Sequence, residues 1–111
     1  MYAQVTYFDG PRSQELIDAA DRAGRDRIEP ALARRPDLTD DIVAMYDLRQ
    51  PDGTQLFVVI ANHAETLQEA GRVIMNTELL PGEDPALLTG PDRIETYEVV
   101  RSGADIAPAV R

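Results

Sequence analysis

The sequence predicts an α+β domain in which a four-stranded antiparallel sheet carries two helices on one face. Segments with the strand and helix periods follow one another as strand, helix, strand, strand, helix, strand. A short turn joins the second strand to the third, and a chain of 111 residues has room for one hydrophobic core. We therefore expect one domain over residues 1–101 and a flexible tail over residues 102–111.

The first strand is expected over Tyr2–Phe8, a run of β-branched and aromatic residues that stops at the turn sequence Asp9-Gly10-Pro11. Apolar residues then recur near helical spacing from Ser13 onward, over about twenty residues. Ser13 is the expected N-cap of this helix. Pro30 has no backbone N–H and crowds the preceding turn, so the helix should kink or restart there.

A hairpin follows, because the strand-like runs Ile42–Leu48 and Thr54–Ala61 flank the turn residues Pro51-Asp52-Gly53. The second helix is expected to begin at Asn62 and to run to about residue 76. Asn62 is a favourable N-cap, and Glu65 has the spacing of a capping box.

The segment 78–92 contains three prolines and two glycines and is expected to be a loop. Loops of this length are uncommon in small domains and often form flaps over binding sites. The final strand is expected over Ile94–Val100, where apolar and polar residues alternate.

The two hairpin strands predict a partner for the sheet. In a split β-α-β domain of the ferredoxin-like type both helices cover one face, so the other face meets water or a partner. Leu56–Ala61 and Ile42–Met45 place apolar side chains on both faces. A monomer with an added layer is the alternative, but no further helical segment remains in the sequence. We expect a homodimer, whose two-fold axis buries the same patch twice.

Composition limits the function classes. Twenty acidic and eleven basic residues give a net charge of −9, which disfavours nucleic-acid and anionic membrane partners. The absence of cysteine excludes disulfides and thiol chemistry. The N-terminal residues do not resemble a signal peptide, so a cytoplasmic location is expected. No phosphate-binding loop or metal-ligand spacing is present, so no metal site and no cofactor are predicted.

His63 is the only histidine and the strongest candidate for a catalytic acid or base. The alternative is an exposed residue in the first turn of the second helix. Its neighbour Asn62 is a second candidate site residue, although a role as helix cap is sufficient to explain it.

Three tyrosines, Tyr7, Tyr46 and Tyr97, lie in the middle of predicted strands. Their hydroxyls are candidates for binding a phenolic or quinoid molecule in a cavity between the sheet and the helices, and core packing is the alternative. Arg72 lies on the second helix and faces either the same cavity or solvent. The pair Arg34-Arg35 is explained as a complement to the dipole of the first helix.

The layout resembles a known family. The matching segments are the helix end Arg27-Ile28-Glu29-Pro30-Ala31-Leu32, the exit Arg35-Pro36-Asp37, the hairpin turn Pro51-Asp52-Gly53, and the closing strand from Asp92 to Val99. Over nearly its whole length the chain resembles the dimeric α+β barrel superfamily, and within it the antibiotic biosynthesis monooxygenase-like branch.

The resemblance implies a homodimer and a small-molecule site. Members of the branch include cofactor-independent oxygenases of aromatic polyketides and haem-degrading enzymes. Several of the oxygenases carry a tryptophan after the third strand, where His63 stands in this chain. One hypothesis is therefore a cofactor-independent monooxygenase acting on an aromatic or quinoid molecule. A non-catalytic dimer that binds a ligand or has a structural role is the alternative, and haem breakdown is a third.

Overall fold

The computed structural model describes residues 1–103 and confirms the predicted α+β fold. The strands are β1 (Tyr2–Phe8), β2 (Ile42–Arg49), β3 (Gln55–Ala61) and β4 (Arg93–Glu98). The helices are α1 (Gln14–Ala23), α2 (Glu29–Ala33), α3 (Pro36–Thr39) and α4 (Ala64–Met75), with a π-helical turn η1 (Gly24–Ile28) and a short 3-10 turn η2 (Pro85–Leu87). The predicted flexible tail falls largely on residues 104–111, which lie outside the described residues.

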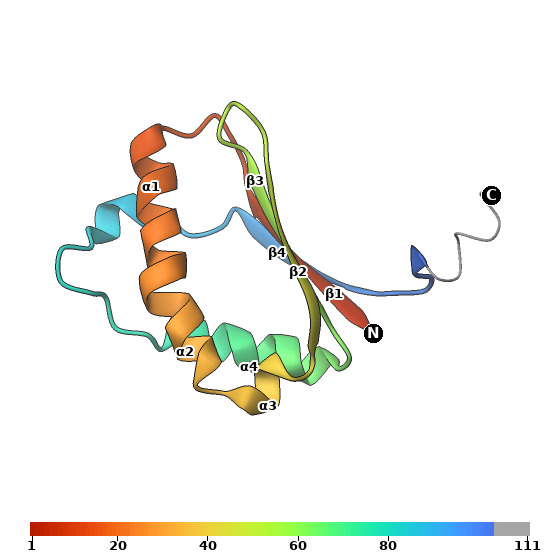
Figure 1. The fold of residues 1–111 in the computed structure, drawn as a ribbon. Coiled ribbons are helices and arrows are strands. Elements are labelled where there is room, and N and C mark those ends of the chain that lie inside the picture. Colours follow the sequence, from red (N-terminus) through yellow and green to blue (C-terminus); the bar gives the residue numbers. More distant parts are fainter. Residues whose placement is uncertain (104–111) are drawn as a thin grey trace.

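All strand pairs are antiparallel, in the order β2-β3-β1-β4, and the helices lie on one side of the sheet (Figure 1). The helix side can be assigned from side-chain contacts. Phe8 packs edge-on against Phe57, with ring centroids 6.2 Å apart, and Arg49 pairs with Asp21 of α1. Because side chains alternate along a strand, Val59 shares this face with Phe57.

None of the helices described within residues 1–103 covers the opposite sheet face, which is called the open face below. The register places alternate residues of every strand on it. Its members include Ala3, Val5, Tyr7, Ala44, Tyr46, Leu48, Leu56, Val58, Ile60, Arg93, Glu95 and Tyr97. Phe57 and Val59 therefore lie on the helix side, and Val58 and Ile60 lie on the open face.

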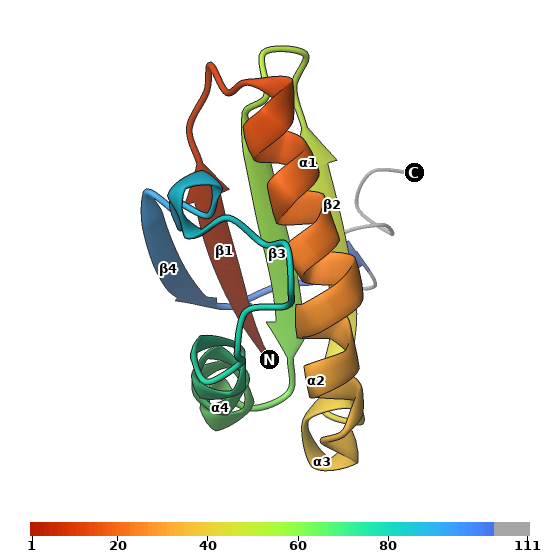
Figure 2. The same ribbon diagram turned by 90° about the vertical axis from the view of Figure 1, so that its left-hand side faces the viewer.

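The first helical segment is interrupted and restarts next to Pro30, as predicted. Ser13 caps α1, because its Oγ accepts a hydrogen bond from the Leu16 backbone N–H at 3.2 Å. The π-helical turn η1 follows, in which Glu29 N–H bonds to the carbonyl of Gly24 five residues back. Helix α2 then restarts with Pro30 in its first turn, where a missing N–H costs no helical hydrogen bond (Figure 2).

The hairpin turn between β2 and β3 contacts the start of α1. Gly53 adopts a φ of +94°, and a Cβ there would lie 2.8 Å from the carbonyl oxygen of Arg12. Only glycine fits this close approach without a shift of the backbone. The turn thereby fixes the chain between β1 and α1, since Arg12 N–H also bonds to the Asp52 carbonyl at 2.9 Å.

The most buried apolar residues lie around the helices α2, α3 and α4 and the end of β3. They are Ala23, Leu32, Leu38, Ala61 and Leu67. Helix α3, which the sequence analysis did not predict, contributes Leu38 to this core. No helix among the described residues is long and apolar enough to cross a membrane.

Candidate functional site

His63 forms an ion-pair geometry with Asp41, which lies just before β2. Asp41 Oδ1 is 2.8 Å from His63 Nδ1, and Asp41 Oδ2 accepts hydrogen bonds from His63 N–H at 3.1 Å and from Thr66 Oγ1 at 2.6 Å. The His63 side chain is 71% exposed, whereas that of Asp41 is 15% exposed. The carboxylate thus orients an imidazole that is largely exposed, and an oriented imidazole can act as a general base.

These contacts also hold Asp41 in its ionised form. The hydrogen bond from Thr66, together with those from His63, lowers the pKa of the Asp41 carboxyl, against the opposing effect of desolvation. The sequence analysis did not identify Asp41 as a candidate residue. The sequence did contain a signal for this contact. Asp41 directly precedes one strand of the predicted hairpin and His63 follows the other, so the two residues meet at the same end of the hairpin.

The predicted cap of the second helix is wrong in position. His63, not Asn62, is the N-cap residue of α4, and the His63 side chain makes no capping bond. Asn62 instead donates from Nδ2 to the Asp41 carbonyl at 3.3 Å, and the Asp41 carboxylate bonds to residues in the first turn of α4. The capping function therefore comes from a residue distant in sequence.

The three candidate tyrosines lie on the open face, not between the sheet and the helices. The Tyr7 and Tyr97 hydroxyl oxygens are 3.5 Å apart, and Tyr97 also bonds to Glu95. The bond to Glu95, followed by the bond to Tyr7, raises the pKa of the Tyr97 phenol. Tyr46 lies on β2, which β3 separates from β1 and β4, the strands of the other two hydroxyls. The structure thus brings two of the three tyrosines together, whereas the His63 side chain contacts Asp41.

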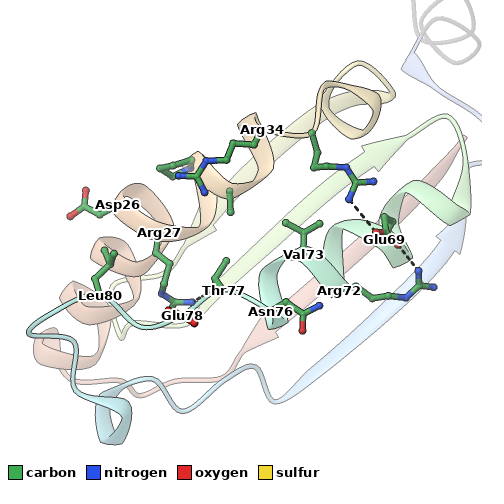
Figure 3. A pocket seen from close by; sticks show the side chains of 13 residues that line it. Asp26, Arg27, Arg34, Glu69, Arg72, Val73, Asn76, Thr77, Glu78 and Leu80 are labelled. Carbon is green, nitrogen blue, oxygen red and sulfur yellow. Dashed lines mark hydrogen bonds and ion pairs between the residues drawn. The ribbon is translucent and has the colours of Figure 1, made fainter.

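A groove of about 640 Å³ lies between η1 and α2 on one side and α4 on the other (Figure 3). Arg72 is the one candidate residue from the sequence that lines it. Arg27, Arg34 and Arg35 line it as well, and the sequence analysis missed them as a group because they are distant from Arg72 in the chain. The sequence did contain a signal for this grouping, because the spacing of Arg27 and Arg34 places them on the same side of a helical segment.

Within residues 1–103 no group of three or more histidine, aspartate or glutamate residues could hold a metal ion. The polar clusters described above pair a carboxylate with an imidazole or with guanidinium groups, and such pairs act through hydrogen bonds and charge.

Comparison with known proteins supports the fold. No protein-family model matches the chain, and no curated protein matches its sequence. Among solved structures, a dimeric ferredoxin-like protein from an uncultured marine organism superposes with a TM-score of 0.58 at 14% identity, over 91% of this chain and 92% of that one. The likeness shows a ferredoxin-like fold.

Two structures of SnoaB, a cofactor-independent oxygenase from Streptomyces nogalater, superpose less closely. A mutant form of SnoaB gives a TM-score of 0.47 and the other SnoaB structure 0.46, each at 16% identity over 91% of both chains.

Proposed function

We propose that this chain works as a homodimeric ligand-binding domain that assembles through its open face. The groove lined by Arg72 supports the ligand-binding part of this proposal, and one observation carries the dimeric part. The open face is largely apolar, and Tyr46, Leu48 and Tyr97 on it are 54%, 48% and 46% exposed in the single chain. Contiguous exposed apolar surface of this kind is typical of protein interfaces. The dimeric state of the ferredoxin-like neighbour adds support.

The experiment is light scattering on the purified chain and on two variants. The wild type should give about twice 12.3 kDa at micromolar concentration. Leu48→Glu should shift the mass toward one chain, because it buries a charge in the interface. Met75→Glu is the matched control, since Met75 is 83% exposed on α4, away from the sheet. A wild-type mass of one chain, or an equal effect of both variants, contradicts the proposal.

A second candidate function is a cofactor-independent monooxygenase acting on a flat aromatic or quinoid carbon acid. The observation that favours it is the pairing of His63 with Asp41. In this reaction the His63 Nε2 would take a proton from the substrate carbon, and the resulting carbanion would reduce O₂. Overall, a CH₂ group of the substrate and O₂ are converted to a C=O group and water, so that atoms and electrons balance. Asp41 would act as a positioning residue for the imidazole.

Oxygen uptake with an anthrone, corrected for the uncatalysed rate, tests this second function. His63→Ala should lower the enzymatic rate by about tenfold or more, a typical effect of losing a general base. Asp41→Asn should lower it less and alter the pH profile of the rate. An uptake equal to that of buffer alone, or a His63→Ala variant of full activity, would leave only the binding function.

A further inference from the structure

We propose that the groove between α2 and α4 binds a small organic anion, with Arg35 and Arg72 holding its carboxylate or phosphate group. The apolar part of such a molecule would rest on Pro30, Ala31, Val73 and Leu80, which line the same groove. This inference does not rest on the proposed dimer, because the groove lies on the helical side of the molecule (Figure 3).

The charge of the groove differs from that of the whole chain. The chain has a net charge of −9, and its basic residues number eleven. Four of them, Arg27, Arg34, Arg35 and Arg72, line the groove together with the three acids Asp26, Glu69 and Glu78. Three of these side chains also pair with residues outside the lining: Arg27 with Glu83, Arg35 with Asp37, and Asp26 with Arg25. The charges at the groove therefore balance in a chain of net charge −9, so the groove repels an anion less than the rest of the surface does.

The contacts of Glu69 show which chemical group these arginines bind. Its Oε1 accepts from Arg35 Nη1 at 3.2 Å, and its Oε2 accepts from Arg72 Nη1. Guanidinium groups from two separate elements thus converge on one carboxylate. Guanidinium groups bind carboxylates and phosphates through the same planar donor geometry. An external anion would therefore compete with the Glu69 side chain.

Hydrogen-bond donors at the groove remain available to such an anion. Arg72 is 65% exposed and uses one of its nitrogens in the bond to Glu69. Arg35 Nη1 donates to Glu69, whereas Arg35 Nε and Nη2 donate to Asp37 at 3.0 and 2.9 Å, so Arg35 Nη1 is released when Glu69 is displaced. Arg27, in contrast, is already committed to Glu83 and Thr77.

On the side of the groove that carries Arg27, a largely buried ion pair holds the structure in place. The Arg27 and Glu83 side chains are 12% and 3% exposed, and Arg27 Nε donates to Glu83 Oε1 at 2.9 Å. Arg27 and Asp26 belong to the π-helical turn η1, and such turns are frequent at functional sites. The groove volume of about 640 Å³ lies within the usual range for small-molecule sites.

The first experiment titrates the chain with benzoate, phenyl phosphate and the uncharged benzyl alcohol, followed by amide chemical shifts. The two anions should shift amides of residues 26–35 and 69–80, whereas benzyl alcohol should not. Stronger binding of benzoate or of phenyl phosphate identifies the preferred anionic group. Equal shifts with the alcohol, or anion shifts spread outside these residues, would overturn the proposal.

The second experiment measures the anion affinity of variants. Arg35→Gln and Arg72→Gln should each weaken anion binding by about fivefold, because each removes a charged donor. Arg101→Gln makes the same charge change at an exposed position outside the groove and should have less than about a twofold effect. Melting curves of the variants should show that each one is folded. An equal loss of affinity in all three variants would overturn the assignment of Arg35 and Arg72.

Glu69→Gln gives the sharpest test. It removes the competing carboxylate, so anion binding should strengthen by about fivefold. Glu65→Gln is the matched control on the same helix, since Glu65 is exposed and does not line the groove. Unchanged or weaker binding by Glu69→Gln would show that the arginines only maintain the fold.

Discussion

At the scale of single residues, Asp41 connects two distant parts of the chain. Its carboxylate accepts hydrogen bonds from His63 N–H and Thr66 Oγ1, both at the N-terminal end of α4. A negative charge at this end also interacts favourably with the helix dipole. Asp41 thereby fixes the position of α4 relative to the start of β2, and the imidazole of His63 is oriented as a consequence.

This arrangement predicts a pH dependence of stability. The pKa of Asp41 is lowered in the folded state, so the carboxylate stabilises the fold above about pH 4, its usual unfolded pKa. The contribution is lost as the pH falls through the lowered value. In urea unfolding from pH 7 to pH 2, Asp41→Asn should be less stable than wild type at pH 7, and the difference should shrink at low pH.

Asp40→Asn serves as the control for this prediction, because the exposed Asp40 side chain makes no hydrogen bond or ion pair within residues 1–103. If the free energy of unfolding differs between Asp41→Asn and wild type by the same amount at all pH values, the contribution of Asp41 to stability does not depend on the charge of its carboxylate.

The same residues show what local patterns can predict. Asn62 was expected to cap α4, because asparagine followed by Glu65 fits the capping-box spacing. The actual acceptor, Asp41, is 22 positions away from the residue whose N–H it binds. Such a partner depends on the packing of β2 beside β3, which helix-terminus patterns do not report.

At the scale of elements, the long segment 78–92 is attached to the first helical segment. Glu83 Oε1 accepts from Arg27 Nε and also from Leu80 N–H at 2.9 Å, and Arg22 donates to the Pro81 carbonyl at 2.8 Å. Loops of this length often form flaps over binding sites. The observed contacts hold the first half of this loop against α1 and η1, and its Glu78 and Leu80 line the groove.

Glu83→Gln should therefore destabilise the domain by about 2–3 kcal/mol, because it leaves the largely buried Arg27 without its counter-charge. Urea unfolding measures this change, and hydrogen exchange should increase over residues 78–92. Glu78→Gln, an exposed position in the same segment, should change stability by less than about 0.5 kcal/mol. Unaltered exchange in Glu83→Gln would mean that other contacts hold the loop.

The strands and long helices were predictable because their periodicity extends over many residues. Strand β1 begins and ends where the sequence places it, at Tyr2 and Phe8. Helix α3 spans four residues, Pro36–Thr39, which is too short for any helical period to register. Pro30 indicated an interrupted helix, but the π-helical form of the turn before it depends on tertiary packing.

At the scale of the whole molecule, the two apolar sets of β3 were predictable, but the face that each set occupies was not. Alternation separates Val58 and Ile60 from Phe57 and Val59 without stating which set meets the helices. Tyr7, Tyr46 and Tyr97 were therefore assigned to an inner cavity, whereas the register places them on the open face.

Adjacent residues of β3 consequently provide a test of how the open face is covered. Val58→Ala and Val59→Ala each remove two methyl groups and should cost about 1–2 kcal/mol where those groups are buried. Val59 faces the helices of its own chain, so its loss should lower the melting temperature equally at all protein concentrations. Val58 faces the proposed partner.

The loss at Val58 should therefore weaken the association of two chains. Dimers melt at temperatures that rise with protein concentration, because mass action favours the associated state. Melting curves measured over about a hundredfold range of micromolar concentrations should show this dependence in wild type and in Val59→Ala. In Val58→Ala the melting temperature should fall most at the lowest concentration, where dissociated chains expose the sheet. If the wild-type melting temperature does not change over this range, the open face is not buried by a second copy of the chain.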